Sequence, residues 1–125
     1  MRNLAGTIKD LMNEATTNSH LVINRDTQVK YPYLTYAIET DGPEGNQETM
    51  TIQVQLFDYG TSYTQILGLQ EELENVFHKR RLTTDNHFLQ FVIGTSGNVP
   101  TGTENVMRRD IFIQGKIDWR NKQWL

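Results

Sequence analysis

The side chains in this sequence that could do chemistry are few and widely spaced. There is no cysteine, so neither a thiolate nucleophile nor a thiolate zinc site can form. None of the three histidines, His20, His78 and His87, follows another by three or four residues, the spacing that places two metal ligands on one helix face. We interpret them as a loop residue, a cation at a helix end and a surface residue at a strand start. With no nucleophile elbow or phosphate-binding loop, we predict no enzyme, no cofactor and no metal.

Two charged groups are compact in sequence but lack the spacing of a catalytic site. Glu71, Glu72 and Glu74 point in different directions if their segment is helical, which is typical of a solvated face. The basic run Lys79–Arg81 could bind an anion, but cations there also complement the negative end of a preceding helix. We favour the second interpretation.

Arg108 and Arg109 precede Asp110 at the start of a predicted strand, where successive side chains point to opposite faces. One arginine could therefore pair with Asp110 or with an acidic residue of a neighbouring subunit. The alternative is that they are ordinary surface charges. We retain both arginines as candidate interface residues.

Three tyrosines, Tyr31, Tyr33 and Tyr36, could stack on bases, as the aromatic residues of sheet-based RNA readers do. The net charge of −3, however, argues against a nucleic-acid-binding face, which is usually basic. The preference of aromatic residues for strands explains the tyrosines as well.

Two polar segments rich in turn-forming residues are predicted to be long, mobile loops, Asp41–Glu48 and Gly94–Asn105. The first carries Asp41, Glu44 and Glu48. These acids repel DNA and suit either a contact with another protein or a lumen through which DNA slides. The alternative is that both segments are ordinary hairpin loops.

The C-terminal end is apolar for a free terminus, with Trp119, Trp124 and Leu125. Pro32 cannot donate a backbone hydrogen bond, so it marks a strand start or an edge strand. From these features we predict self-association through sheet edges and the C-terminal strand.

The element that organises the sequence is an amphipathic helix predicted over Thr61–Arg81. Its apolar residues recur at steps of three or four and are Ile66, Leu69, Leu73, Val76 and Phe77. A second helix is predicted over Asn3–Ala15. Strands are predicted over Tyr31–Thr40, Met50–Phe57, His87–Ile93 and Val106–Trp119, and a further short strand at Leu21–Ile23 is left open.

The resulting order, α-β-β-α-β-β, favours an α+β fold with a mainly antiparallel four-stranded sheet and two helices packed on one face. The 125 residues suggest a single domain over residues 1–125. No apolar run approaches about 20 residues, the length that crosses a bilayer, and the N-terminus is too polar for a signal peptide. We therefore expect a non-secreted protein with no membrane partner.

Three stretches follow one another in a distinctive order, YPYLTYAIE, MTIQVQLFDYGTSYTQILGLQEELENVF and RRDIFIQGKIDWR. An N-terminal helix precedes the Tyr-Pro-Tyr strand, an acidic hairpin loop follows it, and a strand ending in an aromatic residue leads into the amphipathic helix. This pattern of elements spans nearly the whole chain. It resembles the small tail-terminator (tail-completion) proteins of long-tailed bacteriophages.

The resemblance implies a structural virion protein of a phage or prophage tail, present in the host cytoplasm during assembly. Such proteins form a ring, a homohexamer, on the head-proximal end of the tail tube, where they stop elongation and provide the head–tail joining surface. The implied partners are further copies of the chain, the tail tube protein and the head–tail connector or stopper protein, with DNA only passing through the lumen. The family has no catalytic residues, so none is implied here.

Two other functions stay open. The chain could be a head–tail connector or stopper protein of the phage neck. It could also be an enzyme or ligand-binding module on a ferredoxin-like sheet, which requires a concave pocket with convergent polar groups.

Overall fold

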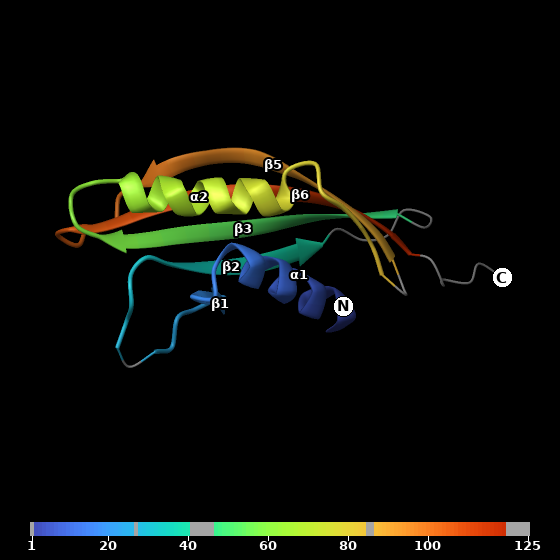
Figure 1. Ribbon diagram of the computed structural model, residues 1–125, viewed down its shortest axis with the longest axis horizontal. Coiled ribbons are helices and arrows are strands. Elements are labelled where there is room, and N and C mark those ends of the chain that lie inside the picture. Colours follow the sequence, from blue (N-terminus) through green and yellow to red (C-terminus); the bar gives the residue numbers. More distant parts are fainter. Residues whose placement is uncertain (1, 27, 41–46, 85–86, 120–125) are drawn as a thin grey trace.

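The computed structural model describes residues 2–26, 28–40, 47–84 and 87–119 (Figure 1). Along these residues the chain forms two helices and six strands. In order they are α1 (Arg2–Ala15), β1 (Ser19–Leu21), β2 (Tyr33–Thr40), β3 (Gln47–Tyr59), α2 (Thr64–Phe77), β4 (Arg81–Thr83), β5 (His87–Val99) and β6 (Val106–Trp119).

The strands form one sheet in the order β1-β2-β3-β6-β5-β4. Its centre is made by β3, β6 and β5, which are antiparallel neighbours of 13 or 14 residues each. β1 is parallel to β2 at one edge, and β4 is antiparallel to β5 at the other. The sheet curls into a half-barrel, and α2 lies along its long strands (Figure 1).

The prediction of a four-stranded antiparallel sheet was wrong, although the α+β class is right. The additional strands, β1 and β4, have three residues each, too few for an alternating pattern to appear in the sequence. They join the sheet through backbone hydrogen bonds, which almost any residue can make. The parallel pairing of β1 with β2 makes the sheet mixed.

α2 is shorter than the helix predicted over Thr61–Arg81, because the backbone turns extended at His78 and takes a φ of 57° at Lys79. The basic run therefore lies beyond the helix and not in its last turn. Arg80 still reaches back, donating a hydrogen bond from Nη1 to the carbonyl of Val76 at 3.5 Å. One of the three basic side chains thus complements this helix end.

β5 is longer than predicted, and most of the expected loop Gly94–Asn105 is not a loop. After a register shift between Ile93 and Ser96, β5 continues to pair with β6 as far as Val99. At Gly94 an added Cβ would lie 2.9 Å from the carbonyl oxygen of Phe112, so only glycine fits this irregularity. The connection between the two strands is reduced to residues 100–105.

A single core lies between the helices and the inner face of the sheet, and it confirms both predicted apolar stripes. All five stripe residues of α2 are buried, as are Leu4, Ile8, Leu11 and Met12 of α1. From β3 they meet the alternating residues Met50, Ile52, Val54 and Leu56. The intervening side chains of β3 point to the opposite, outer face of the sheet, which no helix of the described residues covers.

Candidate interaction surfaces

The histidines lie apart in the fold and form no metal site. His20 belongs to β1, where its Nε2 is 3.1 Å from Oδ1 of Asn18 and 3.8 Å from the carboxylate of Asp26. His78 follows α2, and its Nδ1 accepts a hydrogen bond from the backbone N–H of Ile93 at 3.3 Å. Among the described residues, no group of three or more His, Asp or Glu side chains could hold a metal ion.

His87 is buried, which corrects the prediction that it lies on the surface. Its Nδ1 is 2.6 Å from Oγ1 of Thr84, which follows β4. Burial disfavours the charged imidazolium and lowers the pKa of His87 below its ordinary value of 6.5.

This lowered pKa predicts an acid-sensitive fold. Below pH 6.5 the unfolded chain takes up a proton at His87 more readily than the folded protein, so stability falls as the pH drops toward the folded-state pKa. We expect the Tm to fall between about pH 7.5 and about pH 5.5, and the His87→Gln variant to lose part of that fall. Thermal unfolding followed by circular dichroism would measure both profiles. Equal slopes for the two proteins would contradict the prediction.

The predicted interface residues of the acidic segment and the C-terminus are only partly within the structure. Outside the described residues lie Asp41, Glu44 and Trp124. Glu48 belongs to β3 and is half-buried, with its backbone opposite Ile117 of β6. Trp119 is the last residue of β6, and its backbone pairs with β5. Their place in an interface stays a prediction.

Arg108 and Asp110 form a two-bonded ion pair on the outer face. Nε and Nη2 of Arg108 donate to the two carboxylate oxygens at 2.8 and 2.9 Å. The hydrogen bond to Asp110 raises the pKa of Arg108 above its ordinary value. Of the alternatives that the sequence left open, the structure realises the pairing with Asp110.

Arg109 points to the other face, as strand alternation predicted, and connects three elements. Its Nη1 donates to Oδ1 of Asn98 at 2.8 Å and its Nη2 to Oγ of Ser96 at 3.2 Å, both in β5. Its Nε donates to Oε1 of Gln70 in α2. The guanidinium therefore fastens the end of the β5–β6 hairpin to the helix.

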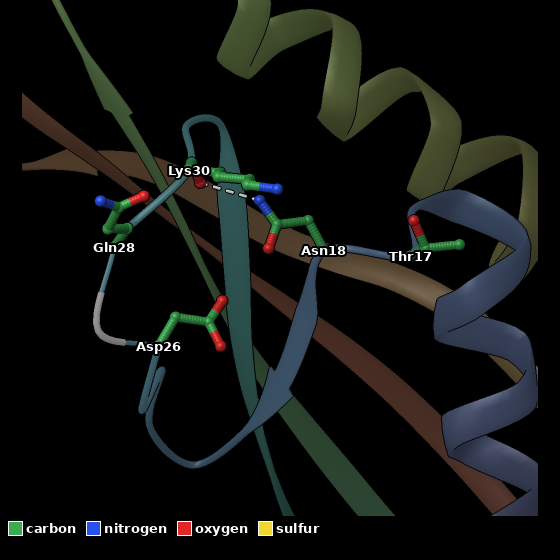
Figure 2. A pocket seen from close by; sticks show the side chains of 5 residues that line it. All are labelled: Thr17, Asn18, Asp26, Gln28 and Lys30. Atoms are coloured by element: carbon green, nitrogen blue, oxygen red, sulfur yellow. Dashed lines mark hydrogen bonds between the residues drawn. The ribbon is translucent and has the colours of Figure 1, made fainter.

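An open hollow of about 570 Å³ lies beside the segment between β1 and β2. It is lined by polar residues, and Figure 2 shows Asp26, Gln28 and Lys30 around it. Across the hollow, Nδ2 of Asn18 donates to the carbonyl of Lys30 at 2.8 Å (Figure 2). The same amide nitrogen donates to the carbonyl of Pro32 at 3.0 Å. Asn18 thus connects this segment to the start of β1. This structural role accounts for the polar side chains that gather around the hollow.

The three tyrosines considered for base stacking do not form one platform. Tyr33 stacks on Phe57 of β3 with ring centroids 4.9 Å apart, and Tyr31 lies 5.5 Å from Tyr33 and 6.0 Å from Tyr59. Tyr36 instead lies in the core, where burial raises its pKa. The aromatic row at one end of the outer face therefore consists of Tyr31, Tyr33, Phe57 and Tyr59.

An exposed apolar tip, Leu21–Ile23, was not predicted from the sequence. Its three consecutive large apolar side chains are all more than half exposed. The segment was considered only as a possible strand, but β1 ends at Leu21. The apolar triplet and the polar residues after it, Asn24, Arg25 and Asp26, are visible in the sequence, but they do not show that the triplet is exposed.

No helix within the described residues is both long and apolar enough to span a membrane.

No protein family matches this sequence, and no curated protein matches it. Several solved structures are similar in fold, and two of them are described here. One, from the virion of a native gene transfer agent particle, aligns with a TM-score of 0.69 at 6% identity, covering 86% of this chain and 84% of that chain. The other, known by a sequence identifier alone, aligns with a TM-score of 0.71 at 12% identity, covering 98% of this chain and 99% of that chain. At such identities the similarity establishes a common fold.

Proposed function

We propose that this chain is a structural protein of a phage-like virion. The observation that carries the proposal is the fold shared with a chain of a gene transfer agent virion over most of both chains. The hollow beside Asn18 is open and lined by polar side chains, unlike the apolar, enclosing pockets of ligand-binding modules.

More specifically, we propose that the chain caps the head-proximal end of the tail tube. The order of elements that resembles tail terminators supports this role. In it, a closed ring of copies, a hexamer, stops tube elongation and offers a surface to the head–tail connector or stopper protein. DNA passes only through the lumen. The protein is then part of the tail in the finished virion and lies in the host cytoplasm during assembly.

Tube assembly in the presence of the protein tests this role directly. Tubes of the phage or prophage that encodes the chain should carry the labelled protein at one end only, and their growth should stop when it is added during assembly. Deleting its gene should give overlong tails that are not joined to heads. Electron microscopy measures both results.

Binding to heads but not to tubes would show instead that the chain is a neck connector or stopper. Tails of normal length that join heads without the protein would refute both roles.

A further inference from the structure

The exposed side of α2 is acidic and carries a large apolar side chain. Leu67, Glu71 and Glu74 follow one another at steps of four and three residues, so they lie on one side of the helix. All three are exposed, and Leu67 is 49% accessible. Glu72 is exposed as well, and α2 has no Lys or Arg between its first and last residues. We call this side of α2 the acidic helix face.

The outer face of the sheet carries the opposite charge near the β4 edge. Arg81, Gln90, Lys116 and Thr49 pair in register across β4, β5, β6 and β3, so their side chains project from the same face. Met50, the neighbour of Thr49, is buried in the core, which places this row on the outer face. The row therefore presents two cations, and both are exposed.

Apolar side chains and a hollow lie beside these cations. Phe88 and Val92 project from the outer face of β5 on either side of Gln90, and each is 47% exposed. A hollow of about 330 Å³ lies between β3, β6 and β5, and both Val92 and Lys116 line it. The acid that pairs with Phe88 across the strands, Asp118, is half-buried. We call this area over β4, β5 and β6 the basic sheet face.

The single chain does not neutralise either surface. Within the described residues, no ion pair includes Arg81, Lys116 or a glutamate of α2. α2 covers the inner face of the sheet, whereas the basic sheet face is on the outer face. The sheet therefore separates the acids of one copy from its own cations. Opposite charges of this kind can meet only between two copies, where they favour approach and fix the register.

The spacing along the two surfaces also matches. From Leu67 to Glu71 the helix rises about 6 Å, at 1.5 Å per residue. From Gln114, the cross-strand partner of Val92, to Lys116 the strand rises about 7 Å. A helix laid along the strands therefore places Leu67 at the hollow beside Val92 when Glu71 lies opposite Lys116.

We propose that the acidic helix face of one copy packs on the basic sheet face of the next copy. This inference rests on the ring assembly proposed above and identifies its subunit contact. The two surfaces differ and lie on opposite faces of the sheet, so the contact is heterologous, and its repetition gives a ring if the rotation closes. Leu67, Phe88 and Val92 then bury apolar area that the single chain exposes.

Charge reversal tests the contact. Glu71→Lys and Lys116→Glu should each weaken self-association of the purified chain about tenfold, because each replaces an attraction by a repulsion. The double variant Glu71→Lys/Lys116→Glu should associate nearly as the original chain does. An equal mixture of the two single variants should also associate, because each copy then meets an opposite charge on its neighbour. Sedimentation equilibrium at about 0.05 M salt, where screening is weak, measures the association constants.

The matched control is Glu104→Lys, which changes the net charge as Glu71→Lys does but lies in the connection between β5 and β6. Its association should be that of the original chain. All these positions are exposed, so the Tm should not change. The proposal is overturned if the original chain stays monomeric up to about 1 mM, if the single reversals associate normally, or if the double variant is as weak as the single ones.

Disulfide trapping gives a second measurement, because the chain has no cysteine of its own. Leu67→Cys/Val92→Cys, concentrated and oxidised with glutathione disulfide, should give a ladder of covalent multimers on a non-reducing gel. Leu67→Cys/Tyr59→Cys, whose second position is exposed but lies in the aromatic row, should give none. Dimers from Leu67→Cys alone would show that α2 contacts α2 and would refute the contact with the sheet.

These results are independent of the test of the proposed function. If the original chain caps tubes but the charge reversals leave self-association unchanged, the capping role stands and this contact is wrong. If the reversals and their rescue behave as expected but the protein never binds tube ends, the contact stands and the capping role is wrong.

Discussion

Replacing Leu73 by alanine is expected to lower the free energy of unfolding by about 2–5 kcal/mol. Leu73 lies at the middle of the apolar stripe of α2 and is completely buried. Its truncation removes buried methyl groups and leaves a cavity between the helix and the sheet, which the neighbouring side chains fill only in part.

A control for this prediction lies on the same helix. Leu67 is 49% exposed, so Leu67→Ala removes the same atoms at nearly the same helix propensity without opening a cavity. We expect its loss to stay below about 0.5 kcal/mol. Urea unfolding of both variants gives the comparison. If Leu73→Ala and Leu67→Ala cost the same, α2 does not cover the core as the structure has it.

Gly115 and Met50 are expected to be strongly coupled. Gly115 pairs with Met50 of β3 on one side and with Phe91 of β5 on the other. A Cβ added to Gly115 would lie 2.8 Å from Cγ and 2.9 Å from Cε of Met50, and 3.3 Å from the ring of Phe91. Gly115→Ala should therefore overpack the core and cost about 1–3 kcal/mol.

Met50→Ala alone should cost about 2–5 kcal/mol, because Met50 is buried and its truncation leaves a cavity. In the double variant the new Cβ of residue 115 enters that cavity, so the total loss should be smaller than the sum of the single losses by about 1 kcal/mol or more. A double-mutant cycle in urea measures this coupling. Additive losses would mean that the two side chains do not meet.

The candidate surfaces were predictable where the information is local. Strand alternation predicted that Arg108 and Arg109 point to opposite faces, and their sequence neighbour Asp110 was named as a partner. The acceptors of Arg109 were not predictable, because they lie 11 to 39 residues away on a hairpin and a helix. The apolar tip was missed for a related reason: an apolar triplet does not reveal whether a neighbouring segment covers it.

The sequence by itself determined the elements that show a period over several turns or pairs. Such periods predict the buried stripes of α1 and α2, the alternation in β3 and the full extent of β6. In each of these elements, apolar and polar positions recur in a regular order over many residues. Only the tertiary structure decided the number of strands. β1 and β4 are strands because β2 and β5 offer them backbone partners, and a hydrogen bond between distant backbones leaves no mark on residue type.

The extent of β5 was decided in the same way. Gly94, Ser96 and Gly97 have the composition of a loop, and local propensity is weak for such a segment. Pairing with the long strand β6 overrides that propensity, because each added pair satisfies backbone groups that would otherwise need water. What this sequence encodes locally is therefore the helices, the core and the central strands. The edges of the sheet exist only once the chain has folded.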